Sequence, residues 1–249
     1  MIDYPLVWGV LIATAILIYV ILDGFDLGIG ILFPFLENDE QRGTAMNTVA
    51  PVWDGNETWL ILGGGGLFAS FPLAYAVLMP ALYMPILLMM FGLIFRGVSF
   101  EFRSQDKVHE KYWDIAFTGG SMLATLCQGI ALGAFVQGID VVDRAYDGGW
   151  WDWLSPFSLL TGVVLLIGYA LLGATWLVMK TEGALREKAI RYSRITLCLT
   201  VGSIGLISLA TLSLDAQFMQ RWTSWPYMLY SSPVPVAIAA ASYFLWRSL

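Results

Sequence analysis

Long apolar runs separated by short polar segments dominate the chain. The runs cover residues of about 6–35, 52–100, 115–136, 157–179, 195–214 and 228–246. A helix that crosses the hydrocarbon core needs about 20 apolar residues, and the run over 52–100 is long enough for two helices that turn near residues 70–72. Because lipid offers the backbone no hydrogen bonds, each run must be helical. The pattern predicts an all-α polytopic membrane bundle of about seven transmembrane helices, with Pro80 and Pro85 kinking the third.

Lysine and arginine are spread unevenly over the loops between these runs. Short loops that are rich in these residues remain on the cytoplasmic side. The odd-numbered loops and the C-terminal tail hold Arg42, Arg103, Lys107, Lys111, Lys180, Arg186, Lys188, Arg191, Arg194 and Arg247. The even-numbered loops hold only Arg144 and Arg221, and Arg96 lies within a span. We therefore predict a periplasmic N-terminus and a cytoplasmic C-terminus.

The acidic loop over 137–155 divides the predicted spans into two groups. Residues 1–136 are expected to form a four-helix transmembrane bundle, residues 137–155 a periplasmic loop, and residues 156–249 three further helices of a second bundle. Tryptophan is enriched where helices meet the membrane surface. The outer loops are expected to form such an aromatic belt with Trp150, Trp151, Trp153, Trp222, Trp225 and Tyr227.

The composition excludes several classes of protein. The chain is 58% hydrophobic and 13% charged, whereas a soluble domain is roughly 25% charged. A net charge of −6 without a basic stripe argues against nucleic acid as a partner. Cys127 and Cys198 lie in apolar runs and the single histidine, His109, lies in a polar loop, so neither a disulfide framework nor a metal site is predicted. Without a histidine in any span, the chain is expected to ligate no haem iron itself.

Charged side chains at membrane depth are costly, and they usually mark a pathway or a buried ion pair. Six of them gather near the cytoplasmic ends of the first three predicted spans, namely Asp23, Asp26, Asp54, Glu57, Arg96 and Glu101. Residues three apart share a helix face, which applies to Asp23 with Asp26 and to Asp54 with Glu57. We therefore expect three helices to converge on one polar cluster.

The charges of this predicted cluster do not balance. Five carboxylates face Arg96, with Arg103 at the edge, so either water enters or some carboxyl groups hold protons. A carboxyl group that holds a proton near neutral pH can pass it on. We hypothesise a cytoplasmic proton path with Asp23, Asp26, Asp54 and Glu57 as carriers or polarised neighbours. In the alternative interpretation, Arg96 pairs with an aspartate to fix three helices, while Glu57 and Glu101 face water.

Three motifs occur in order in the first part of the chain. They are DGFDLG over 23–28 with Gly24 and Gly28, WDGNETWL over 53–60 with Trp53, Asn56 and Trp59, and FRGVSFEFR over 95–103. With these motifs, essentially the whole chain resembles subunit II of the cytochrome bd-type quinol oxidases, including their cyanide-insensitive branch.

The resemblance implies an accessory subunit of a respiratory oxidase in the prokaryotic cytoplasmic membrane. Its partner, subunit I, would hold haem b and haem d, or a third b-type haem in place of haem d. Subunit I would oxidise quinol near the outer face and reduce dioxygen with protons from the cytoplasm. Subunit II would stabilise subunit I and offer a proton route. A small single-helix subunit, membrane lipid and quinone are further implied partners.

The resemblance also implies about two further helices after the region where this chain ends. On that basis the second bundle is incomplete, and the chain is either a fragment or a variant that completes its bundle with another chain. Two other functions stay open at this stage. Intramembrane carboxylates also suit a proton-coupled transporter or channel, which would predict an inverted repeat that the sequence does not show. A purely structural subunit is the third interpretation.

Overall fold

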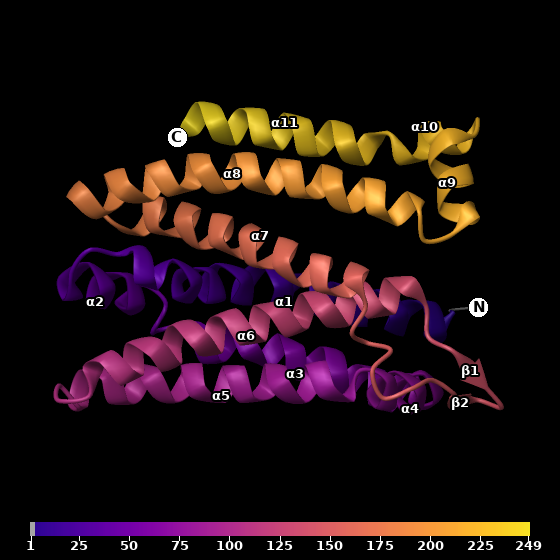
Figure 1. The fold of residues 1–249 in the computed structure, drawn as a ribbon, viewed down its shortest axis with the longest axis horizontal. Helices are drawn as coiled ribbons and strands as arrows, with labels where there is room; N and C mark the ends of the chain where they lie inside the picture. Colours follow the sequence, from indigo (N-terminus) through magenta and orange to yellow (C-terminus); the bar gives the residue numbers. More distant parts are fainter. Residues whose placement is uncertain (1–2) are drawn as a thin grey trace.

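The computed structural model describes residues 3–249, apart from the side chains of residues 216 and 217. The chain is almost entirely helical, as the sequence predicts (Figure 1). Its elements are α1 (Tyr4–Leu32), the 3-10 helix η1 (Phe33–Phe35), α2 (Asp39–Asn47), α3 (Trp53–Ser70), α4 (Pro72–Ala81), α5 (Tyr83–Gln105), α6 (Glu110–Gln137), β1 (Val141–Val142), β2 (Ala145–Tyr146), α7 (Pro156–Lys180), α8 (Gly183–Leu212), α9 (Ala216–Thr223), α10 (Tyr227–Ser231) and α11 (Pro233–Ser248).

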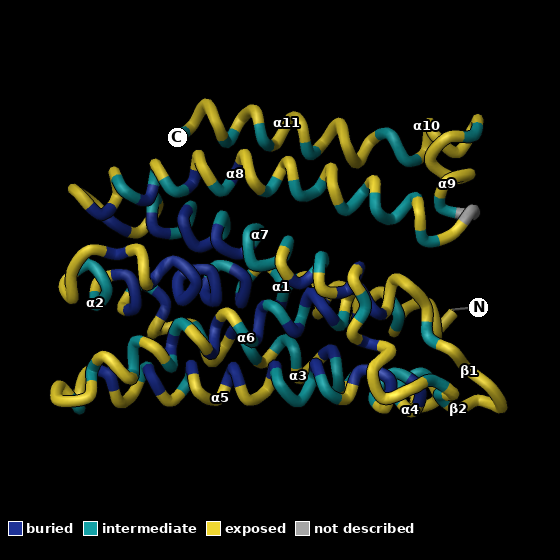
Figure 2. The backbone as a smooth tube through the Cα atoms, in the orientation of Figure 1, coloured by how far each residue is buried: buried dark blue, intermediate teal, exposed yellow. Residues whose placement is uncertain are grey.

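The long helices lie side by side and are packed to different degrees. α1 packs against α3, α6 and α7, and α6 also packs against α5 and α7. α8 lies on α7, and α11 lies on α8 as the outermost helix of the layer in Figure 1. Figure 2 shows buried backbone concentrated in the part that contains α1, whereas α11 is largely exposed. The first three predicted spans therefore contribute their polar residues to the best-packed part of the molecule.

Six of the described helical segments are long and apolar enough to cross a membrane. They are Tyr4–Phe35, Tyr83–Gln105, Glu110–Gln137, Pro156–Lys180, Gly183–Leu212 and Tyr227–Ser248. The predicted second span, α3, is less apolar because its first turns contain Asp54, Asn56 and Glu57. Its 18 residues nevertheless extend over roughly 27 Å, and it packs along α1. The two termini lie at opposite ends of the bundle in Figure 1, which fits an odd number of crossings with α3 as the seventh.

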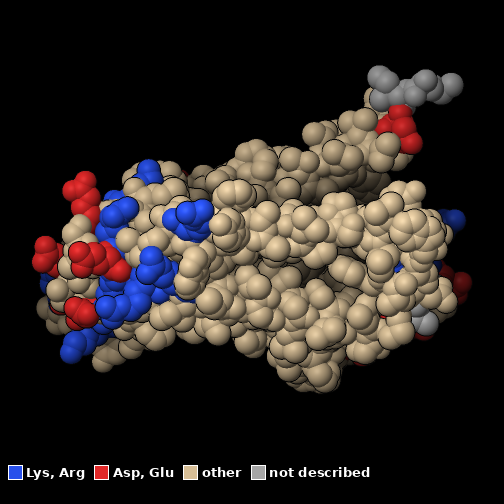
Figure 3. All heavy atoms as spheres, turned by 90° about the horizontal axis from the view of Figure 1, so that it is seen from above, with Lys and Arg blue, Asp and Glu red and all other residues tan. Residues whose placement is uncertain are grey.

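Charged side chains gather at one end of this bundle. In Figure 3 most of the visible Lys, Arg, Asp and Glu residues lie at the left-hand end, a few lie at the right-hand end, and the surface between the two ends is largely uncharged. That end holds α2, the connection between α5 and α6, and the start of α8 (Figure 1). We call it the charged end. By the distribution of Lys and Arg we predict that it faces the cytoplasm.

The connection between α3 and α5 differs from the predicted one. α3 ends at Ser70 as expected, but the next residues form the short helix α4, and the following long helix begins only at Tyr83. Pro80 therefore lies in α4, and Pro85 lies in the first turn of α5. The expectation that both prolines kink the third span was wrong. In a first turn the backbone N–H groups have no intrahelical partner, so Pro85 removes no hydrogen bond there.

The basic segment after α7 is helical and is not the predicted loop. α8 begins at Gly183, about twelve residues before the predicted start, so Arg186, Lys188 and Arg191 lie on its first turns. Lys188 Nζ donates to Glu37 Oε1 at 2.9 Å, which ties α8 to the connection between α1 and α2. Because the ammonium group of Lys188 favours the ionised carboxylate, the pKa of Glu37 lies below its usual value.

The loop at the opposite end contains a two-stranded hairpin of β1 and β2. Trp150 and Trp151 are each 62% exposed, as an interfacial anchor would be. Trp153 is instead buried against Ala81, Ile130 and their neighbours, and its Nε1 donates to the carbonyl oxygen of Trp150 at 2.9 Å. The assignment of Trp153 to the aromatic belt was therefore wrong, because this indole is part of the core.

The glycines of DGFDLG allow α1 and α7 to cross at close range. A Cβ atom at Gly28 would lie 1.9 Å from the carbonyl oxygen of Tyr169, and one at Gly173 would lie 2.4 Å from the carbonyl carbon of Gly28. Only residues without a side chain permit such an approach of two helix backbones.

Gly28→Ala is expected to lower the melting temperature of the folded chain, because the added methyl group meets backbone that cannot move aside. Overpacking of this kind costs about 1–3 kcal/mol. Gly64→Ala is the matched control, since a Cβ atom at that helical glycine meets nothing within 4 Å. Thermal unfolding in mild detergent, followed by circular dichroism, measures both variants. Equal melting temperatures for the two variants would contradict the close crossing.

Candidate functional site

Arg96 of α5 is fully buried and lies among three carboxylates. Its Nη1 is 3.5 Å from Asp23 Oδ1 and 2.9 Å from Glu57 Oε1, and its Nη2 is 3.0 Å from Asp26 Oδ1. The side chains of both aspartates are also fully buried, whereas that of Glu57 is 23% exposed. We call Arg96, Asp23, Asp26, Glu57 and Asn56 the Arg96 cluster.

The local sequence explains why these side chains meet. Asp23 and Asp26 lie one turn apart on α1 and face α5. Gly24, between the two aspartates, and Gly28, after them, face α7. Asn56 on α3 donates from Nδ2 to Asp26 Oδ2 at 2.9 Å, and also to the carbonyl oxygen of Leu22 at 3.3 Å. One motif therefore supplies the acidic face and the packing face of α1.

Aromatic residues of the other two motifs cover the cluster. The guanidinium carbon of Arg96 lies 5.3 Å from the centre of the Phe100 ring. Trp53 stacks on the same ring at 5.0 Å between centroids, with an interplanar angle of 11°. Trp59, the other tryptophan of WDGNETWL, is half-buried and forms no ring stack among the described residues. The motif residues thus divide into ion-pairing groups and an aromatic cover.

The Arg96 cluster has more acidic groups than basic ones, and its hydrogen bonding is incomplete. If all three carboxylates were ionised, its net charge would be −2, counted as three negative charges and one positive charge. Arg96 Nε has no hydrogen-bond partner among the described residues, and the buried Asp26 Oδ1 has no partner there other than Arg96 Nη2. A proton bound to a carboxylate would reduce the excess negative charge, and a water molecule could accept a hydrogen bond from the buried Nε–H. Such a cluster is chemically suited to take up and release protons.

Two of the six predicted residues lie outside the cluster. Asp54 is exposed, and its Oδ1 accepts a hydrogen bond from the neighbouring Gly55 N–H. Glu101 is exposed and makes no ion pair with Arg96. The prediction that five carboxylates surround Arg96 was therefore wrong, and the number is three. Residues three apart on a helix differ by about 60° in direction, which is enough to turn Asp54 away from Arg96 while Glu57 reaches it.

Arg103 belongs to a second ionic group and does not border the Arg96 cluster. Its Nε lies 2.6 Å from Asp114 Oδ1, and its Nη2 lies 3.0 Å from Glu110 Oε1. Arg42 Nη1 approaches the same aspartate at 3.4 Å. This group joins α2, α5 and α6 at the charged end, and the sequence pattern gave no sign of it because its members lie in three separate polar segments.

An open groove between α3 and α5 leads to the Arg96 cluster. Its volume is about 620 Å³, and its lining is mostly apolar apart from Glu57 and Glu101. Glu57 is the member of the cluster that lines this groove, and it also contacts Arg96 directly. It therefore connects the surface to the buried aspartates.

A chain of polar side chains extends from the buried side of the cluster. Tyr19 lies one turn before Asp23 and interacts with its carboxylate. Gln128 Nε2 of α6 donates to the hydroxyl oxygen of Tyr19 at 2.6 Å, and the hydroxyl of Tyr169 on α7 donates to Gln128 Oε1 at 2.8 Å. The sequence analysis missed these three residues. The available signal was a single amide, Gln128, within an otherwise apolar run.

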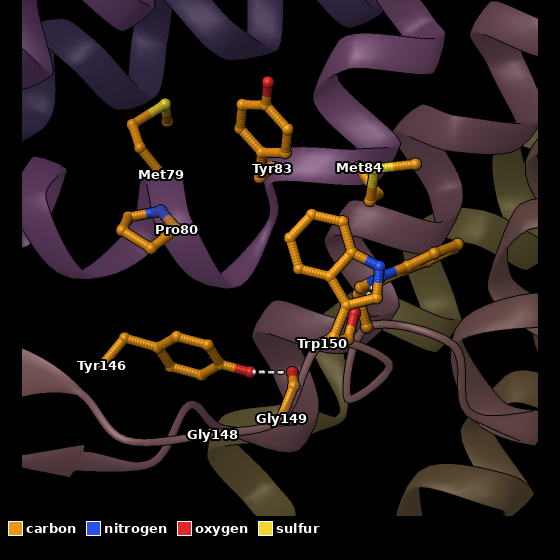
Figure 4. A pocket seen from close by; sticks show the side chains of 9 residues that line it. Met79, Pro80, Tyr83, Met84, Tyr146, Gly148, Gly149 and Trp150 are labelled. Atoms are coloured by element: carbon orange, nitrogen blue, oxygen red, sulfur yellow. Dashed lines mark hydrogen bonds between the residues drawn. The ribbon is translucent and has the colours of Figure 1, made fainter.

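A cavity near the opposite end has a different character. It holds about 660 Å³ between α4, the start of α5 and the loop between α6 and α7, and no Asp, Glu, Lys or Arg lines it. Figure 4 shows Met79 and Tyr83 across the pocket from Tyr146 and Gly149, and the Tyr146 hydroxyl donates to the Gly149 carbonyl oxygen at 2.7 Å. Such a lining suits apolar groups and offers no acid–base chemistry. The chemistry of the chain therefore concentrates at the Arg96 cluster.

Comparison with known proteins places this architecture in a family. The family model described as cytochrome bd terminal oxidase subunit II matches residues 4–249. The chain belongs to this family. This match confirms the resemblance that the three motifs indicated.

Several curated relatives agree with the family assignment. A probable cytochrome oxidase subunit 2 of Haemophilus influenzae is 32% identical and covers 98% of this chain and 68% of its own length. A cytochrome bd-I ubiquinol oxidase subunit 2 of Escherichia coli is 36% identical over 83% of this chain and 57% of its own length. A cytochrome bd ubiquinol oxidase subunit 2 of Bacillus subtilis is 32% identical over 73% of this chain and 55% of its own length.

The match thus spans between 55% and 68% of the length of these relatives. The bacterial relatives and the six apolar helices together identify the chain as a multi-pass protein of the bacterial cytoplasmic membrane.

Proposed function

We propose that the chain is the accessory second subunit of a respiratory quinol:dioxygen oxidoreductase. The observation that carries this proposal is the family match over 4–249, together with relatives described as ubiquinol oxidase subunit 2. In this proposal the chain stabilises subunit I, where quinol is oxidised and dioxygen is reduced.

We place the haem groups in subunit I. Haem in a helix bundle needs axial histidine, methionine or cysteine ligands within the membrane. The single histidine of this chain, His109, is exposed at the charged end, and its Nδ1 lies 2.9 Å from Asp106 Oδ2. No histidine of this chain lies within a membrane-length helix, and methionine in apolar helices serves as a packing residue far more often than as a ligand. We therefore assign haem b with haem d, or with a third b-type haem, to the partner. A small single-helix subunit, lipid and quinone complete the proposed assembly.

Within that assembly, the Arg96 cluster is proposed as a route for protons from the cytoplasm. Glu57 would receive a proton at the groove and exchange it with the buried aspartates, which Arg96 holds within 3.5 Å. Asp54, exposed one turn before Glu57, would collect protons at the surface. The competing interpretation is that the same ion pairs only fix α1, α3 and α5 to one another. Substitutions that separate these two interpretations are described in the Discussion.

Purification with a tag at the N-terminus tests the proposed assembly. The chain is expected to leave its native membrane in mild detergent with a larger partner. The reduced-minus-oxidised absorption spectrum of that preparation should show haem b together with haem d or a further b-type haem. A colourless preparation without a partner would contradict the oxidase proposal and would favour the transporter, which a proton-flux assay in vesicles can then test.

A further inference from the structure

A second cavity lies at the charged end, and none of its lining residues lines the groove at the Arg96 cluster. Its volume is about 410 Å³, and it lies between η1, α2 and the first turns of α6. Arg42, Lys111 and Asp114 form its polar part, while Phe33, Ile115 and Gly119 belong to its apolar part. The cavity is therefore amphipathic, and its polar part lies next to the polar segments of the chain.

The polar part of this cavity has an excess of available positive charge. The single carboxylate of the lining, Asp114, is shared by Arg103 at 2.6 Å and Arg42 at 3.4 Å, whereas the lining holds two cations, Arg42 and Lys111. Lys111 has no carboxylate within 4.0 Å among the described residues. Arg42 uses Nη1 for its ion pairs with Asp114 and Asp39, and its Nε is buried without a hydrogen-bond partner in the described part of the chain. Arg42 is thus already paired, whereas Lys111 is a cation of the same cavity without a carboxylate partner among the described residues.

Aromatic contacts hold the arginines of this end in place. The guanidinium carbon of Arg42 lies 6.0 Å from the centre of the Phe33 ring, and that of Arg103 lies 5.4 Å from the same centre. Phe33 is itself buried against Phe117, and Arg42 also pairs with Asp114 at 3.4 Å. The Arg42 group is therefore fixed at the wall of the cavity before any ligand binds, which reduces the entropy cost of binding.

The apolar part of the cavity continues along α6 toward the membrane core. Ile115 is 68% exposed, and a Cβ atom at Gly119, one turn further, would meet nothing within 4 Å. A shallow open track thus runs from the cations along the helix surface. A soluble anion would use only the cations, whereas a molecule with an anionic head and a hydrocarbon tail would use both parts.

We propose that this cavity binds one anionic phospholipid. Its phosphate would lie between Arg42 and Lys111, and an acyl chain would follow Ile115 and Gly119. Basic pockets between helices at the cytoplasmic side of a membrane suit such head groups. This site is independent of the proton route, because it shares no residue with the Arg96 cluster.

Native mass spectrometry of the delipidated preparation tests the proposal with two probes, phosphatidylglycerol and phosphatidylcholine. Each cation near an anionic lipid is worth roughly a fivefold change in affinity. We therefore expect phosphatidylglycerol to bind at least about fivefold more tightly than phosphatidylcholine. Lys111→Gln should remove most of that preference, and Gly119→Leu should weaken the binding of both lipids by filling the track.

Lys107→Gln is the matched control, because Lys107 lies in the connection between α5 and α6, four residues before Lys111, and pairs with Glu110 at 3.3 Å without lining the cavity. It should bind both lipids as the unaltered chain does. Equal affinity for the two lipids, or an unchanged preference in Lys111→Gln, would overturn the proposal. Competition by millimolar inorganic phosphate as strong as that by phosphatidylglycerol would also overturn it, because the site would then be an anion site without a lipid.

Discussion

Replacing Arg96 with methionine is expected to remove most of the folded chain from the membrane. The substitution leaves Asp23 and Asp26 buried without the cation that lies within 3.5 Å of both. Removing one partner of a buried ion pair costs about 3–5 kcal/mol, which is a large part of a typical stability of about 5–15 kcal/mol. The yield of monodisperse protein after extraction in mild detergent, and its melting temperature, measure the effect.

A rescue variant separates the ion pairs from simple loss of packing. When Arg96→Met is combined with Asp23→Asn and Asp26→Asn, the uncompensated charges are removed as well. The yield should then recover in part, because a neutral polar group is less costly to bury than a charge. Arg221→Met, at an exposed position of α9, is the control and should behave as the unaltered chain does. Full yield of Arg96→Met alone would show that the cluster does not stabilise the bundle.

Glu57→Gln is expected to slow oxygen consumption at least tenfold while the complex still assembles. Glutamine keeps the size of the side chain and can accept the hydrogen bond from Arg96 Nη1, but it cannot carry a proton. A positioned acid or base typically contributes about 10²–10⁴-fold to a proton-transfer rate. Oxygen uptake per haem, measured with saturating quinol, gives the turnover independently of the amount of complex.

Two further variants complete this comparison. Asp23→Asn should produce a similar loss, because Asp23 is the aspartate next to the polar chain of Tyr19 and Gln128. Glu40→Gln is the control, since Glu40 is exposed on α2 at the same end of the molecule and should leave turnover unchanged. Poor assembly combined with normal turnover per haem in Glu57→Gln would support the purely structural interpretation instead.

The centre of the candidate site could be predicted because its signal is local and strong. Asp23 and Asp26 stand out as charges within an apolar run, and their spacing places them on one helix face. Arg96 is the only basic residue within a predicted span. Since a buried carboxylate and a buried arginine both need a partner, the convergence of these residues follows from their burial alone.

The edge of the site could not be predicted in the same way. Whether Asp54 or Glu57 reaches Arg96 depends on the rotation of α3 about its own axis, which packing against α1 determines. The partner of Arg103 is Asp114, which comes from the next helix and has no spacing rule that links the two. Gln128 and Tyr169 meet only because α6 and α7 pack against each other. Each of these facts depends on tertiary packing and leaves no periodic pattern in the chain.

The same distinction between local sequence signals and tertiary packing applies to the fold. The apolar runs located the long helices, because length and hydropathy are local properties. The runs did not show that α8 begins at Gly183, because its first turns are polar and extend beyond the apolar segment. They also did not separate α4 from α5, since both are apolar. The division into bundles over 1–136 and 156–249, and the cytoplasmic position of the charged end, stay predictions.

Proton uptake during a single turnover tests the proposed route most directly. The purified complex is reconstituted into vesicles in one orientation, reduced, and mixed with oxygen in the presence of a membrane-impermeant pH indicator on the side of the charged end. The unaltered complex should take up protons from that side at the rate of oxygen reduction, and Glu57→Gln should take them up at least tenfold more slowly. Uptake from the opposite side, or an unchanged rate in Glu57→Gln, would contradict a proton route through the Arg96 cluster.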